Sequence, residues 1–170
     1  MPEDPADILD ALEGAEDAFG GYAAGMPEYE EELDPSANGP PVIQLRKACR
    51  LLDACRTLRN HDGYHTSAIE MSFAAIERTL EYYALGASND SIDDFQDHER
   101  AYDRAAALGV FSPEVARRLK SLYAENRSAS YYRDIVATES QAETMFALAV
   151  VIHDYVASFG QQSHECRCRR

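Results

Sequence analysis

The stretch HTSAIEMSFAAIERTLEYYAL, residues 65–85, is the most apolar helical pattern in this chain of 170 residues. Its apolar and small side chains recur at helical spacing: Ala68, Ile69, Ser72, Phe73, Ala75, Ile76, Leu80 and Tyr83. The small residues among them are spaced i, i+4 and i+7, which lets a neighbouring helix approach closely. We therefore predict a helix over residues 65–86 against which a neighbouring helix packs closely.

The segments on either side are also helical in pattern, and from Val42 onward we find no alternation typical of strands. NHDG and Ser112–Pro113 are stop and start signals, and Thr138 with Gln141 forms a capping box. The further predicted helices span residues 41–59, 91–108, 113–131 and a last segment from the capping box to Val156. Val115, Leu119 and Leu122 are expected to face inward. The fold class is all-α, an antiparallel bundle of four to five helices.

Charge divides the chain into an acidic arm and a nearly neutral body. Residues 1–40 hold twelve acids and no Lys or Arg, so they account for −12 of the net charge of −14. Residues 5–19 favour a short amphipathic helix within this partly disordered arm. The predicted domains are the arm at 1–40, a helical bundle at 41–159 and a Cys/Arg tail at 160–170.

Two lysines against fourteen arginines, with abundant acids, are typical of a protein adapted to high salt. A genome that favours Arg codons explains the same bias. The chain has no apolar run long enough to span a membrane and no signal segment at its start. We expect a halophilic, cytoplasmic protein without a membrane partner.

The histidine and cysteine pattern does not predict a metal site or another cofactor. Cys49 and Cys55 are six residues apart and turn to different helix faces, which argues against a disulfide. Cys166 and Cys168 in the tail could bind a soft metal, but no His/Cys pair flanks them at finger spacing. His153 lies on an apolar helical stripe, and we expect a packed core histidine there.

Two other polar strings have ordinary explanations. The acidic residues around His98 (Asp93, Asp94, Asp97 and Glu99) imitate a metal cluster, but a solvated helix face explains them better. RNHDGYH, residues 59–65, contains an arginine and two histidines at acid–base spacing, yet Asn, Asp and Gly are the residues of a helix-to-helix turn.

The string AENRSASYYRD, residues 124–134, is the strongest binding candidate. It closes a zone, residues 100–133, that holds seven bases and three acids. Arginines in this field could contact phosphate while tyrosines stack on bases. The candidate site residues for RNA, nucleotide or partner binding are Asn126, Arg127, Tyr131, Tyr132 and Arg133. A structural role explains the same residues equally well. In that case the arginines pair with acids on neighbouring helices, and the tyrosines cover a contact between helices.

The order of these segments resembles a HEPN domain. The resemblance covers roughly residues 41–159 and is carried by GYHTSAIEMSFAAIERTLEYYAL, a short polar helix, and LGVFSPEVARRLKSLYAENRSASYYRD leading into the last helix. It implies an all-helical homodimer. Many HEPN proteins act beside a minimal nucleotidyltransferase in toxin–antitoxin pairs, and in some of them the partner nucleotidylates a tyrosine near the motif.

The resemblance also implies a chemistry. In active HEPN proteins an arginine stabilises the phosphorane charge while a histidine a few residues later moves the 2′-hydroxyl proton, so RNA is cleaved without metal. Here no histidine follows Arg127 within the motif. Arg127 carries over as a phosphate contact, and Tyr131 and Tyr132 carry over as modification or stacking positions.

These observations lead to three hypotheses. The first is a HEPN-like protein that works with a nucleotidyltransferase partner in a toxin–antitoxin or RNA-defence module and binds RNA or nucleotide. The second is an active metal-independent endoribonuclease with Arg127 and Tyr131 as catalytic residues and Arg133 as an auxiliary. The third is a non-catalytic module whose Arg/Tyr helix forms a dimer interface.

Overall fold

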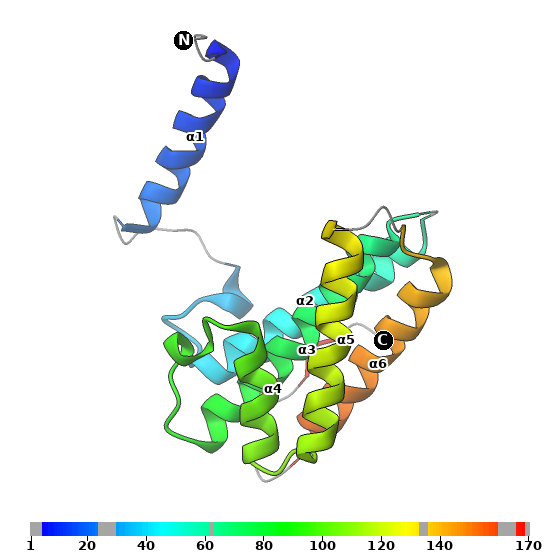
Figure 1. Ribbon diagram of the computed structural model, residues 1–170. Coiled ribbons are helices and arrows are strands. Elements are labelled where there is room, and N and C mark those ends of the chain that lie inside the picture. Colours follow the sequence, from blue (N-terminus) through cyan, green and yellow to red (C-terminus); the bar gives the residue numbers. More distant parts are fainter. Residues whose placement is uncertain (1–4, 24–29, 62, 133–135, 160–165, 169–170) are drawn as a thin grey trace. The chain divides into compact units, whose positions relative to one another are not determined.

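The computed structural model describes residues 5–23, 30–61, 63–132, 136–159 and 166–168, and every element in these ranges is helical (Figure 1). Two compact units, residues 1–31 and 32–170, divide the chain. The first contains α1 (Ala6–Ala23), whose described apolar side chains Ile8, Leu9, Leu12 and Phe19 are exposed. The helix predicted at residues 5–19 is therefore confirmed. No described helix has the length and apolarity required to cross a bilayer.

The second unit is an all-α bundle, which confirms the predicted fold class. After the short 3-10 turn η1 (Glu31–Leu33), it contains α2 (Pro40–Arg59), α3 (His65–Ala87), η2 (Ile92–Phe95), α4 (His98–Ala107), α5 (Pro113–Tyr132) and α6 (Glu139–Ala157). Local signals set most of these bounds. Gly63 and Gly109 have positive φ angles of 91° and 79° at helix ends, and Thr138 and Gln141 form the predicted capping box.

Helix α3 is the centre of this unit and contacts α2, α4 and α6. Its small residues Ala68, Ser72 and Ala75 are buried, as the spacing predicts. The Cys55 thiol of α2 lies 3.5 Å from the Ala68 carbonyl oxygen and 3.7 Å from Ser72 Oγ. The small side chains thus allow α2 to approach closely.

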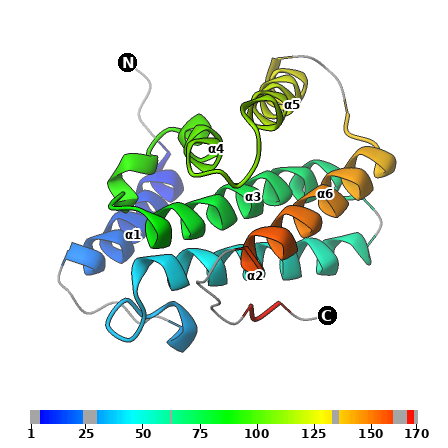
Figure 2. The same cartoon turned by 90° about the horizontal axis from the view of Figure 1, so that it is seen from below.

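The three long helices α2, α3 and α6 lie side by side, with α4 and α5 across α3 (Figure 2). Arg59 of α2 bonds Glu143 of α6, while Cys49 lies beside His153, so α2 and α6 are antiparallel. Helix α6 runs in the same direction as α3. The hairpin of α4 and α5 returns the chain to the end of the bundle at which α3 begins, and this makes the parallel pair possible.

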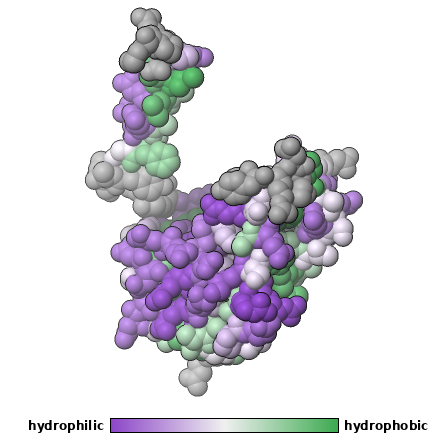
Figure 3. Space-filling view, viewed as in Figure 1, coloured by the Kyte–Doolittle hydropathy of each residue, from purple (hydrophilic) through white to green (hydrophobic). Residues whose placement is uncertain are grey.

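Two helices differ from the sequence prediction in detail. The segment predicted as one helix over 91–108 is split, because Ser91 with Asp94 and then Asp97 each cap a new helical start. Hydrophilic side chains gather over this α4 side of the unit (Figure 3), in agreement with the expected solvated acidic face. On α5, Leu119 is buried as predicted, but Val115 and Leu122 are 38% and 40% exposed.

A buried carboxylate stands between α2 and α3. Glu81 is 2% exposed, and its Oε2 accepts hydrogen bonds from Gln44 Nε2 at 2.6 Å and Arg78 Nη1 at 2.8 Å. Burial is the largest influence on this carboxyl and raises its pKa to about 7, although Arg78 opposes the shift. Between pH 4.5 and 7 the native protein therefore holds a proton that the unfolded chain has lost.

We expect the free energy of unfolding to fall as pH rises through this window, because Glu81 must ionise while buried. The rise from 4.5 to about 7 corresponds to a loss on the order of 3 kcal/mol. In Glu81→Gln this part of the pH dependence should disappear, making the variant relatively more stable at about pH 8 than at about pH 6. Urea unfolding at both pH values measures it, with the exposed Glu70→Gln on the same helix as control. An unchanged slope in Glu81→Gln would contradict the assignment.

Candidate metal centre

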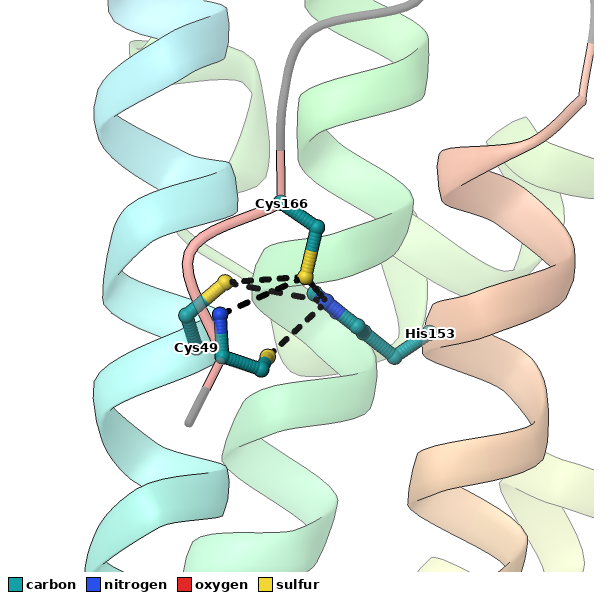
Figure 4. Close-up of side chains that lie close together, drawn as sticks. Cys49, His153 and Cys166 are labelled. Atoms are coloured by element: carbon teal, nitrogen blue, oxygen red, sulfur yellow. Dashed lines mark hydrogen bonds between the residues drawn. The ribbon is translucent and has the colours of Figure 1, made fainter. Parts of the chain in front are cut away.

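Four side chains from three parts of the second unit meet at one point (Figure 4). Cys49 comes from the middle of α2, His153 from α6, and Cys166 and Cys168 from the C-terminal segment. Their ligand atoms, three sulfurs and one imidazole nitrogen, all lie within 4.8 Å of one another. Such a set of three thiols and an imidazole is a common tetrahedral donor set for zinc.

The distances match those between ligands of one small ion. The Nε2 atom of His153 lies 3.1 Å from Cys166 Sγ, 3.3 Å from Cys168 Sγ and 3.7 Å from Cys49 Sγ. Cys49 Sγ and Cys166 Sγ are 3.6 Å apart. A tetrahedron with Zn–S of about 2.3 Å and Zn–N of about 2.0 Å has edges of roughly 3.5–3.8 Å. The cluster is therefore already close to coordination size.

Thr79 of α3 determines which nitrogen of His153 faces the sulfurs. The Thr79 hydroxyl donates its single hydrogen to the Ala75 carbonyl oxygen at 2.7 Å. Its oxygen lies 3.0 Å from His153 Nδ1 and must accept from that atom. The Nδ1 atom therefore carries a proton, and the second nitrogen, Nε2, is the one that can ligate. A hydrogen bond on the far nitrogen is the usual support of a metal-binding histidine.

Burial and mutual contacts shift the pKa values of the cluster in opposite directions: the pKa of the Cys168 thiol is raised, first by its hydrogen bond with Cys166, and that of Cys166 is lowered. His153 and Cys49 are 1% and 2% exposed, whereas Cys166 and Cys168 are half-buried. Hydrogen bonds, first from Cys168 and then from Cys49 and His153, lower the pKa of the Cys166 thiol. Burial by itself lowers the pKa of His153, but its contacts with Cys166 and Cys49 outweigh burial and raise that pKa to about 9. A bound metal would displace the shared Nε2 proton.

The arrangement supports a structural metal more than a catalytic one. A tetrahedral ion held by these residues would have a protein ligand at all four positions, whereas a catalytic zinc keeps a position for water or substrate. The Cys168 backbone N–H also points at Cys166 Sγ, 3.5 Å away, and would stabilise a ligating thiolate. Three soft sulfurs with one imidazole select zinc or a similar thiophilic ion over magnesium or calcium.

Residues 3–168 match the family model for a domain of unknown function, DUF8154. The chain belongs to the DUF8154 family. This match takes in all four residues of the cluster and ends at Cys168. Neither the curated proteins nor the solved structures contain a match to the DUF8154 chain.

The candidates at the end of α5 lie elsewhere in the unit. Arg127 is exposed, and its Nη1 donates to the Tyr123 hydroxyl at 3.0 Å; Asn126 is half-buried nearby. The side chains of Tyr131 and Tyr132, and the whole of Arg133, lie outside the described part of the chain. The structure therefore describes only two of the five predicted binding residues in full.

Several bases of the surrounding zone are paired with acids. Lys120 Nζ of α5 lies 2.6 Å from Asp103 Oδ1 of α4, and Arg104 pairs with Asp90. Arg117 pairs with Glu114 one turn earlier on α5. These contacts support the explanation that bases of residues 100–133 pair with nearby acids, and they weaken the local positive field.

Two further polar features have structural partners. In RNHDGYH, Arg59 bonds Glu143 and lies over the Phe146 ring, 4.3 Å from its centroid, so it joins α2 to α6 at the turn.

A cleft of about 390 Å³ is lined by Lys47, Arg50 and Arg78 with Leu51. Arg50 forms an ion pair with Glu32 at 2.9 Å, and Arg78 forms one with Glu81 at 2.8 Å. Their charges are thus largely balanced.

Sequence reasoning did not bring these four residues together because they are remote along the chain. His153 is buried as predicted, but 104 residues separate it from Cys49, and no local spacing links them. One signal was present. Cys49 and His153 are both polar residues on the apolar sides of their helices, with two further cysteines shortly after the last helix.

The Thr79 contact leads to a test of the ligand geometry. We expect Thr79→Val to lower zinc affinity about 10–100-fold. Without the Thr79 hydroxyl as acceptor for Nδ1–H, neither the orientation of the His153 ring nor its tautomer is fixed. Competition with a chromogenic chelator measures the affinity. Thr57→Val is the matched control, since the Thr57 hydroxyl also bonds a carbonyl one turn back, at Asp53, but on an exposed face. Equal affinities for the two variants would contradict the role of Thr79.

Proposed function

We propose that this protein binds one zinc ion through Cys49, His153, Cys166 and Cys168, and that the ion fastens the C-terminal segment to the bundle. The observation that carries the proposal is the orientation of His153. Its Nδ1 atom is bonded to Thr79 at 3.0 Å, so Nε2 is the nitrogen that faces the three sulfurs, 3.1 to 3.7 Å away, and that would ligate once a metal displaces its proton. A packed histidine without a ligand role has no need for three thiols at one nitrogen.

The energies support a structural role. Zinc binding in small Cys/His domains is worth about 10–16 kcal/mol at neutral pH. The net stability of a typical domain is about 5–15 kcal/mol. The ion would therefore dominate the attachment of a segment that has few other described contacts. The core of α2, α3 and α6 has its own buried side chains, so metal loss should loosen the C-terminal segment and leave the helices formed.

The zinc content tests this function directly. We expect about one zinc per chain in protein purified with zinc present, and a melting temperature several degrees lower after chelation. Cys168→Ser should lose most of the zinc, because a hydroxyl is a poor ligand for this ion. Cys55→Ser should keep it, since Cys55 is a buried thiol of α2 outside the cluster. Mass spectrometry of metals provides the readout, and zinc-free wild-type protein would refute the proposal.

We also propose a second function at the α4–α5 face, in which RNA or a nucleotide is bound, and RNA is cleaved. The supporting observation is a histidine contributed by another helix. His98, at the start of α4, lies beside Tyr123 with ring centroids 5.4 Å apart, and Tyr123 accepts the bond from Arg127. Three side chains of the types used in RNA cleavage are therefore linked across α4 and α5.

A buried carboxylate orients this histidine. Glu77 of α3 is 3% exposed, and its Oε2 lies 2.9 Å from His98 Nδ1. With Nδ1 held by the carboxylate, Nε2 of the half-exposed ring is available to accept the proton of a 2′-hydroxyl. Arg127 would stabilise the charge of the phosphorane. This assignment replaces the histidine that the sequence motif does not contain.

The two residues can be tested with a matched control. We expect His98→Gln and Arg127→Ala each to lower RNA cleavage at least about 100-fold. Arg117→Ala should have little effect, because Arg117 is an equally exposed arginine of α5 that pairs with Glu114. Gel analysis of a labelled RNA measures the rate. RNA binding without cleavage in the wild type would leave a binding role, and no binding would refute this function.

The HEPN resemblance supports two further properties of the same face, a homodimer and a nucleotidyltransferase partner. The exposed Val115 and Leu122 on α5 favour the dimer, because apolar side chains on one helix face are typical of an interface. Light scattering of Arg127→Ala distinguishes a dimer interface from a catalytic site. If the variant folds normally but the dimer dissociates, the result favours the non-catalytic interaction module. Intact mass after incubation with ATP and the partner enzyme reports nucleotidylation of Tyr131 or Tyr132.

A further inference from the structure

The three sulfurs of the metal cluster are close enough to react with one another. Cys49 Sγ and Cys166 Sγ are 3.6 Å apart, and the two side chains point toward each other in Figure 4. The two thiols differ in access, because Cys49 is buried in α2 whereas Cys166 is half-buried on the C-terminal segment. An oxidant from solvent would therefore meet Cys166 first and leave Cys49 to react second.

We propose that a hydroperoxide oxidises Cys166 and Cys49 to a disulfide, which expels the zinc while keeping the C-terminal segment attached to α2. This inference rests on the proposed zinc site. The oxidised and reduced proteins would then have two different links at the same place, one covalent and one through the ion.

The chemistry balances with the peroxide as the sole oxidant. The Cys166 thiolate attacks one peroxide oxygen, the O–O bond breaks, and with one proton this produces a sulfenic acid and water. The Cys49 thiolate then attacks the Cys166 sulfur, the S–O bond breaks, and a second proton leaves with the oxygen as water. Two thiolates, one hydrogen peroxide and two protons thus become one disulfide and two waters.

The metal leaves because too few ligands remain. After the disulfide forms, only His153 and Cys168 have donor atoms for the ion, and two ligands do not make a structural zinc site. The alternative pair, Cys166 with Cys168, would also expel zinc. That pair belongs to one segment and is separated by one residue, so it would free the segment from α2 and close a strained small ring.

The position of Cys49 favours the first pairing. Its sulfur lies on the middle of a long helix, is buried beside His153 and already faces Cys166 at 3.6 Å. Cys55, the remaining thiol, is held between the Ala68 carbonyl oxygen and Ser72 Oγ in the α2–α3 contact. Burial raises the pKa of the Cys55 thiol and makes it a poor nucleophile, which provides a matched control.

The experiment treats zinc-loaded full-length protein with hydrogen peroxide in the presence of a chromogenic zinc chelator. We expect one zinc released per disulfide, an intact mass about 2 Da lower, and a Cys49–Cys166 link in mapped peptides. Reductant with added zinc should restore the starting protein. Cys55→Ser should behave like the wild type, and Cys49→Ser should form no link to α2.

Several results would overturn the inference. These are a Cys166–Cys168 link as the main product, sulfinic acid without a link, or zinc retained after stoichiometric oxidation of the thiols. Zinc-free wild-type protein would instead refute the proposed function and, with it, the metal release. In that case the mapped peptides of the oxidised chain still decide between the two pairings.

Discussion

The buried imidazole of His153 is the constraint on which the arrangement of α2, α3 and α6 depends. Both of its nitrogens need partners, because an unpaired polar group in the core costs about 1–3 kcal/mol. Thr79 serves one nitrogen from α3, while Cys49 of α2 and the two C-terminal cysteines surround the other. In this register the three helices give both nitrogens of the ring a partner, and the same register brings the four candidate metal ligands together.

The parts of the fold that could be predicted from the sequence are those that depend on neighbours along the chain. The buried stripe of α3, the Thr138 capping box and the Gly63 turn each follow from residues within a few positions. The exposure of Val115 and Leu122 does not, because α5 packs mainly on α4 and buries a narrow stripe of Ala116 and Leu119. How wide a helix face is buried depends on how many helices reach it.

The residues of the two candidate sites also divide into those that neighbours along the chain reveal and those that helix packing brings together. Arg127 was recognisable from local composition, since the arginine and its tyrosines lie on one helix. Cys49 and His153 are brought together only by the pairing of α2 with α6, and His98 reaches Tyr123 only through the pairing of α4 with α5. Spacing rules detect ligands on one turn or one helix, so they could not find sites assembled from two or three helices.

Helix α3 connects these two sites mechanically. Thr79 and Glu77 are two residues apart, so their side chains point about 200° apart around the helix axis. One faces His153 of α6 and the other faces His98 of α4. Glu81, four residues after Glu77, lies on the same side as Glu77. An ion bound at the proposed site would stabilise the His153–Thr79 contact and, through α3, the position of the Glu77 carboxylate beside His98. The proposed metal site and the proposed RNA-cleaving face are thus both in contact with α3.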